Sequence, residues 1–372
     1  MSSISSEKDS NFVSNEKGKL YVRPLGIVHG CRVKEVVNSG RGLPLTESGA
    51  FTSCQMIVRD KKGERVDELA VTSLTDWQKK NGTYLSRLLE KIVGRIGNTR
   101  QTIVGQSLSN PLIVGIVNIT PDSFSDGGEY QTVDRAIARG RELFEAGAAL
   151  IDVGGESTRP GANPVSADVE QRRVIPVVSA LAGEGIPVSI DTYHPETMLA
   201  AVKNGARVIN DVTALTADCR SLQTSSSTGA IIVLMHSQTL SGGTERFLGR
   251  KTPIDVYDYL EDRINAAATL GIPRDRIIVD PGLGFMSNPD DNFQILQWLS
   301  LYHGLGCPVM VGASRKFGRL DAGLLPQGRI GGSLAAALHA VDNGVQLIRV
   351  HDVAETKQAL GVWRAIRGMH GN

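Results

Sequence analysis

The chain has 372 residues, enough for one α/β barrel with an appendage but too few for three ordinary domains. Forty Lys and Arg against thirty-nine Asp and Glu give a formal charge of +1, which argues against a nucleic-acid or membrane-surface partner. With 41 glycines and only 5% aromatic residues, the composition suits many short strand–helix turns more than an aromatic-rich β-sandwich.

Nothing in the chain predicts export or membrane insertion. No run approaches the roughly 20 apolar residues that span a bilayer. The Ser-rich opening carries Glu7, Asp9 and Glu16 and has no apolar core, so residues 1–20 are predicted to be a disordered tail rather than a targeting peptide. We expect reduced thiols and a cytoplasmic location, because the cysteines show neither CxxC pairing nor regular spacing. They are Cys31, Cys54, Cys219 and Cys307.

Residues 21–105 are predicted to form a small N-terminal α+β domain. Apolar stretches at 20–29, 54–58 and 69–74 precede a segment, 74–96, whose leucines and isoleucines recur at helical spacing. The polar sequence GNTRQTIVGQSLSNP then links this unit to the rest of the chain. Its role stays open between a packing appendage and a regulatory or loop-covering element.

From Pro111 short β-branched runs alternate with stretches able to form helices, several of which end in Gly. Continuous apolar strands alternating with helices indicate parallel strands buried on both faces. Eight such units over residues 110–372 predict a (β/α)8 TIM barrel. An open doubly wound sheet is the alternative, but no GxGxxG or Walker A motif follows the first strand. The runs lie at 112–118, 149–154, 186–191, 206–211, 230–236, 276–282, 308–314 and 345–351.

Polar residues close nearly all of these runs. A single Asp at a strand end is more often a helix cap or a turn residue. Because barrel enzymes build their active sites at the carboxyl ends of the strands, the repeated pattern favours a composite pocket. These ends are Asn118, Asp152, Asp191, Asn210 with Asp211, His236, Asp280, Ser314 to Lys316, and Arg349 with His351.

Four of these residues could bind the same kind of ligand. The carboxylates of Asp191 and Asp280, the amide of Asn210 and the ammonium of Lys316 suit a flat heterocycle with a guanidine-like donor edge.

A second set suits an anion. Arg349 and His351, with backbone amides of the loop after Asn118, are fitted to a phosphate. Arg159, in a Gly/Pro-rich turn, is suited to hold a carboxylate or to cover the site.

Seven ordered motifs, one per strand end, resemble those of the dihydropteroate synthases. The resemblance covers about residues 110–370, and the order of the motifs makes it specific. The motifs are NITPDSFSDGG (118–128), ESTRPGA (156–162), SIDT (189–192), IND (209–211), DPGLGF (280–285), GASRK (312–316) and RVHDV (349–353).

This resemblance implies condensation of 6-hydroxymethyl-7,8-dihydropterin pyrophosphate with p-aminobenzoate, giving 7,8-dihydropteroate and pyrophosphate in folate biosynthesis. By family analogy Asp191, Asn210, Asp280 and Lys316 grip the pterin. It also implies a sulfonamide target and a homodimer formed through barrel helices.

The resemblance assigns the remaining site residues as well. Asn118 becomes a pyrophosphate residue linked to Mg²⁺, and Arg349 and His351 hold the pyrophosphate. The p-aminobenzoate side and the catalytic loops are assigned to Thr158, Arg159, Pro160, Asp122, Phe124, Phe285 and Phe317.

Three segments depart from the family pattern. Met286-Ser287-Asn288 replaces a usual Gly-Lys-Thr, Phe317-Gly318 follows Lys316 where a small hydroxyl residue is usual, and the stretch after the fifth strand is reduced to residues 236–239. These changes fit ordinary divergence or an altered acceptor subsite. In the second case an aromatic ring at Phe317 is expected to reduce sensitivity to sulfonamides.

Two other functions compete with the synthase. A methyltetrahydrofolate-binding methyltransferase domain shares the barrel and the pterin pocket, but has no use for TPDSF, STRPG or a pyrophosphate clamp. A non-catalytic pterin-binding protein is the other alternative, suggested by the departures and by the extra domain.

Overall fold

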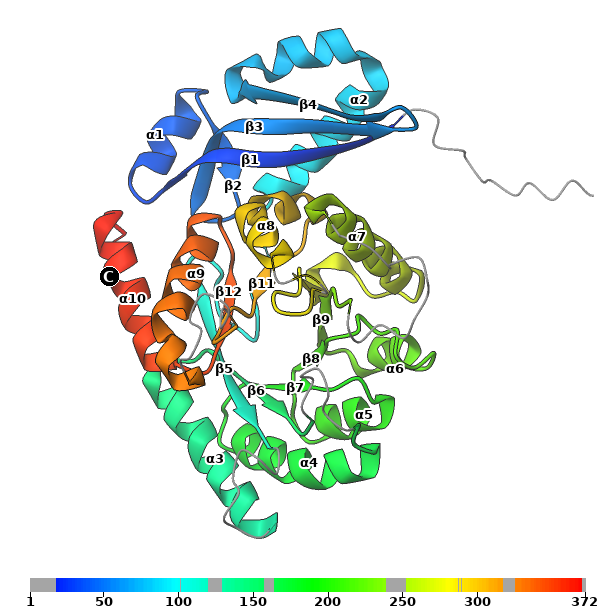
Figure 1. Cartoon of the computed structure of the whole chain (residues 1–372), viewed down its shortest axis with the longest axis vertical. Coiled ribbons are helices and arrows are strands. Elements are labelled where there is room, and N and C mark those ends of the chain that lie inside the picture. The colour runs from blue at the N-terminus through cyan, green and yellow to red at the C-terminus, as the bar shows by residue number, and fades with distance from the viewer. Residues whose placement is uncertain are drawn as a thin grey trace, which may run out of the picture.

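The computed structural model describes residues 18–100, 102–119, 129–156, 164–238, 252–286, 288, 290–316 and 325–369. It shows an N-terminal sheet domain packed against one flank of an eight-stranded parallel barrel (Figure 1). The fold class predicted from the sequence is therefore confirmed. In the described part of the chain, no helix combines the length and apolar character needed to cross a bilayer.

The N-terminal domain is a four-stranded antiparallel sheet with helices. Strand β3 pairs with β1 along one edge, and with β2 and then β4 along the other. The predicted long helix is present, but Gly82 interrupts it with a non-helical backbone (φ 76°, ψ 170°), so it is two segments rather than one. The elements are β1 (Lys19–His29), α1 (Arg32–Asn38), β2 (Leu43–Leu45), β3 (Gly49–Asp60), β4 (Gly63–Ala70), η1 (Val71–Ser73) and α2 (Leu74–Gly97).

Neighbouring residues of β1 face opposite sides of this sheet, as the two-residue period of a strand requires. Leu20 and Val22 pack with α2 in the core of the domain, whereas Tyr21 belongs to the main core of the barrel. The ring of Tyr21 meets that of Tyr257 edge to face, with centroids 5.4 Å apart. The sheet is thus sandwiched between its own helix and the barrel.

The barrel is built from eight strands that occur where the sequence predicts them. They follow the order β10-β9-β8-β7-β6-β5-β12-β11, and a single parallel bridge between Val279 and Val309 joins the two ends. The strands are β5 (Leu112–Asn118), β6 (Leu150–Gly154), β7 (Val188–Asp191), β8 (Val208–Asp211), β9 (Ile231–Met235), β10 (Ile277–Asp280), β11 (Met310–Val311) and β12 (Leu347–Val350).

Helices surround the strands (Figure 1). Two of the described helices begin with side-chain caps: Ser166 caps α4, and Thr252 forms a capping box with Asp255 on α7. The helical elements are α3 (Glu129–Ala146), α4 (Ala167–Gly183), α5 (Pro195–Lys203), α6 (Ser221–Thr228), α7 (Pro253–Thr269), η4 (Arg274–Arg276), α8 (Asp291–Gln297), η5 (Leu299–Leu305), η6 (Pro326–Arg329), α9 (Ile330–Asp342) and α10 (Val353–Ile366).

A packed apolar layer fills the inside of the barrel. It takes one side chain from each of seven strands, and Ile103 and Leu108 of the linker join the same cluster. The barrel is therefore closed below its mouth and is not a pore. The layer consists of Val114, Leu150, Val208, Val233, Ile278, Met310 and Leu347.

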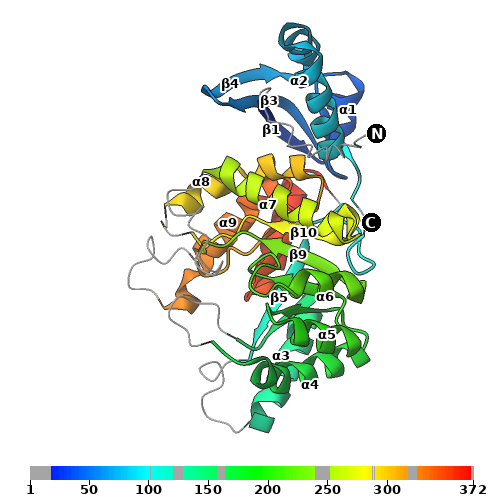
Figure 2. The same ribbon diagram turned by 90° about the vertical axis from the view of Figure 1, so that its right-hand side faces the viewer.

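Ion pairs join the two domains along the flank where the N-terminal sheet lies over α7 and α8 (Figure 2). The carboxylates stand three residues apart on one face of α7. Lys19 Nζ lies 2.5 Å from an oxygen of Asp258 and 2.6 Å from one of Glu261. We call this group the seam cluster: Lys19, Arg59 and Arg95 from the N-terminal domain, with Asp255, Asp258 and Glu261 on α7.

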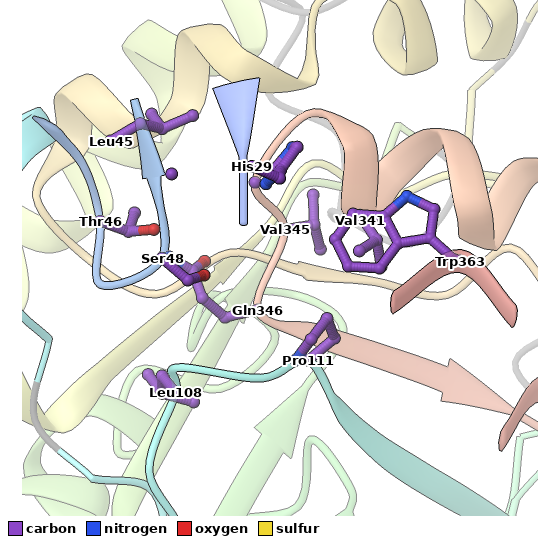
Figure 3. A pocket seen from close by; sticks show the side chains of 12 residues that line it. His29, Leu45, Thr46, Ser48, Leu108, Pro111, Val341, Val345, Gln346 and Trp363 are labelled. Atoms are coloured by element: carbon purple, nitrogen blue, oxygen red, sulfur yellow. The ribbon is translucent and has the colours of Figure 1, made fainter. Parts of the chain in front are cut away.

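The seam continues to the base of the barrel, where it encloses a cavity of about 20 Å³ (Figure 3). That volume accommodates about one water molecule. His29 and Thr46 line it from the N-terminal domain, and Gln346 and Trp363 line it from the barrel. His29 also meets Trp363 edge to face at 5.2 Å. The two domains therefore pack closely along this boundary.

Candidate active site

The register of the sheet brings four strand ends to one level. Asn118 pairs with Gly154, Gly154 with Asp191, and Asp191 with Asn210 across β5, β6, β7 and β8. Gly154 lies between two of these polar side chains: a Cβ there would be 3.6 Å from Asn118 Oδ1 and 3.7 Å from Asp191 Oδ2, ordinary van der Waals contacts. The amide oxygen of Asn118 and the carboxylate of Asp191 therefore lie near the same point of the backbone.

An arginine links two carboxylates near these strand ends. Arg349 donates from Nε to Asp152 and from Nη2 to Asp191, each at 2.6 Å. Asn210 Nδ2 donates to the same Asp152 oxygen at 2.9 Å. With Asp280 and Lys316, these charged residues form what we call the mouth cluster: Asp152, Asp191, Asp280, Lys316 and Arg349.

Lys316 folds over the mouth from the turn after β11. Its Nζ donates to the carbonyl of Leu283 at 2.5 Å and lies 4.7 Å from the centroid of the Phe285 ring. Gly284 makes this approach possible: its φ is +87°, and a Cβ there would come within 2.5 Å of the lysine side chain. The second glycine of the DPGLGF segment, Gly284, is therefore required sterically for Lys316 to reach this position.

Burial governs protonation in the mouth cluster. It raises the pKa of Asp191 to about 7, although Arg349 opposes the shift. It also raises the pKa of Asp280 against the opposing charge of Lys316. For Lys316 burial lowers the pKa to about 8, while Asp280 acts in the other direction. Burial thus disfavours the charged forms of Asp191, Asp280 and Lys316, and a complementary ligand would stabilise those forms.

The four residues predicted to bind a pterin come together in this mouth. Asn210 and Asp280 are each 3% exposed, and Lys316 and Asp191 interact electrostatically with each other. Asp280 accepts from the backbone N–H of Gly282 at 2.7 Å, which orients its carboxylate. Phe285, predicted on the aminobenzoate side, lies beside Lys316.

Two residues predicted to hold a diphosphate, His351 and Arg349, have different surroundings. His351 lies just beyond β12, where its backbone N–H donates to Ser314 Oγ at 3.2 Å. Arg349 is bound to Asp152 and Asp191. Its guanidinium therefore belongs to the same charged group as the pterin residues. The other predicted site residues lie outside the described part of the chain: Asp122, Phe124, Thr158, Arg159, Pro160 and Phe317.

Asp152 closes one of the predicted strands, but its residue type and position alone assign it no role. In the structure Asp152 is 1% exposed and accepts from both Asn210 and Arg349. The signal was present, because an Asp inside the apolar run LIDVG is costly to bury without partners. Its partners were not visible, since Arg349 is 197 residues away in sequence.

Hydrogen bonds also tie the end of β7 to its neighbours. Thr192, next to Asp191, donates to Glu170 Oε2 at 2.7 Å, and Tyr193 donates to Glu156 Oε1 at 2.7 Å. Burial raises the pKa of Glu170, partly offset by the bond from Thr192. The strand end that carries Asp191 is thereby fixed to α4 and to the end of β6.

Comparison with known proteins agrees with this geometry. The model of the pterin binding enzyme family matches residues 114–351. The chain belongs to the dihydropteroate synthase family of pterin-binding enzymes. It is 40% identical over 266 residues to the dihydropteroate synthase of Escherichia coli K12, covering 69% of this chain and 92% of that protein.

Solved dihydropteroate synthases share the barrel. The Xanthomonas albilineans enzyme in complex with 7,8-dihydropteroate is 42% identical, with a TM-score of 0.63, over 70% of this chain and 95% of that one. The Yersinia pestis enzyme with a sulfonamide drug complex is 39% identical, with a TM-score of 0.66, over 72% and 98%. The matched family residues begin at 114, after the N-terminal domain.

Proposed function

We propose that this chain is a dihydropteroate synthase that joins 6-hydroxymethyl-7,8-dihydropterin pyrophosphate to p-aminobenzoate. The observation that carries the proposal is the convergence of Asp191, Asn210, Asp280 and Lys316 in one buried mouth. Membership of the synthase family supports it. The acceptor oxygens of the mouth match the N–H edge of an aminopyrimidinone, and Lys316 supplies a donor for a ring carbonyl or nitrogen.

The reaction breaks the bond between the pterin methylene carbon and the diphosphate oxygen, and the electron pair leaves with the diphosphate. The aniline nitrogen then forms the new C–N bond and loses a proton. The buried carboxylates favour positive charge that develops on the pterin, and they need no nucleophilic side chain for this. The main task of these residues is to position the pterin and to stabilise charge.

Asn118 and His351 are proposed to hold the diphosphate, with Arg349 beneath it. Oxygen ligands suit Mg²⁺, which commonly binds through one or two protein oxygens together with substrate phosphates. The amide oxygen of Asn118, at the end of β5, fits that donor set. No cluster of three or more His, Cys, Asp or Glu forms a self-contained metal site in the described ranges. Bound Mg²⁺ would neutralise charge on the leaving diphosphate.

The aminobenzoate side is proposed from the STRPG turn, the first loop, Phe285 and Phe317. Two of the unusual residues nearby are explained by packing. Met286 is buried in the barrel core, and Asn288 accepts from the backbone of Asp290 at 3.1 Å at the start of α8. This supports ordinary divergence for that segment. For Phe317 we propose that its ring makes sulfonamide inhibition weaker than in a typical family member. The variant Phe317→Ser should restore the stronger inhibition.

A coupled pyrophosphate assay tests the proposal. Pyrophosphate release that requires both substrates and Mg²⁺ is expected from the full-length protein. Pterin binding without turnover would instead indicate a non-catalytic binder, and methyl transfer to cobalamin would indicate the methyltransferase alternative.

We also propose a homodimer and a cytoplasmic location. All four cysteines are free, which suits a reducing compartment. Val362 and Ile366 on α10 are 58% and 75% exposed, and Phe144 on α3 is 39% exposed, so these helices offer apolar surface for a second copy. Light scattering on the purified protein would give the oligomeric state.

A further inference from the structure

The turn that carries Lys316 follows β11, the shortest strand of the barrel. Strand β11 pairs with β12 over only two residue pairs, Met310 with Leu347 and Val311 with Ile348. Lys316 lies five residues beyond the last of these pairs. Side-chain contacts must therefore hold this turn beside the end of β12.

Arg315 supplies several of these contacts. Its guanidinium makes a two-pronged ion pair with Asp352, from Nε at 3.1 Å and from Nη2 at 2.5 Å. Its backbone N–H donates to Ser333 Oγ at 2.8 Å, and its carbonyl accepts from Arg329 at 3.5 Å. The ion pair is only partly exposed, at 25% and 17% of the two side chains.

The backbone of Arg315 is itself unusual, with φ at +60°. A residue with a Cβ rarely adopts this left-handed conformation unless its surroundings impose it. The consequence here is that Arg315 points toward α10 while the next residue, Lys316, turns toward Asp280 and Leu283.

We propose that Arg315, through Asp352, is a positioning residue that holds Lys316 in the mouth and fixes the β11 end to the β12 end. It acts as a latch and does not bind the diphosphate. Two of its guanidinium nitrogens are committed to Asp352, and a paired Arg–carboxylate fork has a defined geometry that a lysine cannot reproduce. Asp352 directly follows His351, so the latch also sets the distance between the pterin and diphosphate residues. This inference rests on the proposed synthase activity.

Four variants distinguish a positioning role of Arg315 from direct binding of the diphosphate by Arg315. Arg315→Lys and Asp352→Asn each remove the fork, and Arg315→Gly removes it while tolerating the positive φ. For each we expect kcat/KM for the pterin substrate to fall about tenfold, because a misplaced lysine weakens transition-state contacts. The double variant Arg315→Gly with Asp352→Asn should fall no further than either single change.

Arg220→Lys is the matched control. Arg220 makes the same two-pronged contact with Asp218, at 3.0 and 2.5 Å, on an exposed surface. Loss of that fork should leave kcat/KM unchanged.

The alkaline limb of the pH profile reports on Lys316 directly. Asp280 on β10, Asp191 at the end of β7 and Arg349 on β12 face its ammonium group, and burial dominates its lowered pKa. Releasing the turn exposes the lysine to water, so the limb should move from about 8 toward higher pH in the Arg315 and Asp352 variants. A purely global loss of stability would lower activity without moving the limb.

The outcomes are distinct. If wild-type protein makes no product, the proposed function fails and the latch is not the cause. If wild-type is active but Arg315→Gly and Arg315→Lys retain its kcat/KM and its alkaline limb, the latch is wrong. If Asp352→Asn leaves diphosphate-substrate affinity intact or higher while Arg315→Lys lowers it, Arg315 is a direct ligand and the inference is overturned. Should Arg315→Gly fail to fold, Arg315→Lys and Asp352→Asn decide between these results.

Discussion

Asp191, Asp280 and Lys316 of the mouth cluster resemble the seam cluster in residue type, but their pKa shifts run in the opposite direction to those of Lys19 and Glu261. In the mouth, burial raises the pKa of Asp191 and Asp280 and lowers that of Lys316. Their charged forms are thus disfavoured before a ligand arrives. Removing charge from water without full compensation costs free energy, so such a site gains when a ligand supplies the missing partners.

In the seam cluster the opposite charges outweigh burial, so the net pKa shifts favour the charged forms. Burial lowers the pKa of Lys19, but Glu261 and Asp258 more than offset it, and the net pKa is raised. Burial raises the pKa of Glu261, yet Lys19 and Arg95 bring it below its ordinary value. These charges satisfy one another and need no ligand. Asp191, Asp280 and Lys316 thus differ from the seam groups in the direction of their pKa shifts, although both sets lie among opposite charges.

Removing the N-terminal domain should give the largest effect, because it tests the seam as a whole. A Δ1–105 chain uncovers η5, whose residues 299–305 are all buried, and leaves three α7 carboxylates without their cations. We expect aggregation or loss of cooperative unfolding, measured by size-exclusion chromatography and circular dichroism. A monodisperse barrel with the full-length Tm would show that the seam is dispensable.

Removing one charge from the mouth should abolish synthesis without loss of the fold. For Asp191→Ala or Lys316→Ala we expect product formation to fall by at least about 10³-fold, since both side chains are proposed to hold the pterin ring in place for the reaction. Thermal unfolding checks that the fold is intact, and Asp218→Ala on the surface serves as the control. Normal turnover by either variant would remove the pterin-pocket assignment.

The pH profile should sharpen the contrast between the clusters. Asp191 must be ionised to accept N–H bonds, and its pKa of about 7 predicts that kcat/KM falls as pH drops below that value. Lys316 must be protonated, and its pKa of about 8 predicts a fall as pH rises above it. We expect a narrow bell-shaped curve. A flat profile from pH 6 to 9 would contradict the shifts.

A single seam charge should matter least. Lys19 is about one-third exposed (33%), and water screens such pairs, so Lys19→Met should reduce the free energy of unfolding by only about 0.5 kcal/mol. Chemical denaturation would measure this, with Lys79→Met as a control at a more exposed pair, Lys79 with Asp76. Activity should not change. A large loss of kcat/KM would mean that the seam also shapes the mouth.

Much of the barrel was predictable because its signals are local. Each strand is a short apolar run, and each closes on a polar residue that the parallel topology sends to one rim. The break in α2 was harder to predict from the sequence, because the apolar spacing continues past Gly82. Only the positive φ of Gly82 reveals the interruption. Strand β11 was overestimated for a related reason, since the apolar run PVMVGAS leaves the ladder after Val311.

The amino-acid sequence by itself determined the barrel, its polar rim and the family to which the chain belongs, because strand period and strand-end chemistry are written residue by residue. The tertiary structure alone decided which charges meet. Arg349 reaches Asp152 and Asp191 across 197 and 158 residues, and Lys19 reaches Asp258 across 239. Those meetings depend on sheet register, barrel closure and domain docking, which no local pattern encodes.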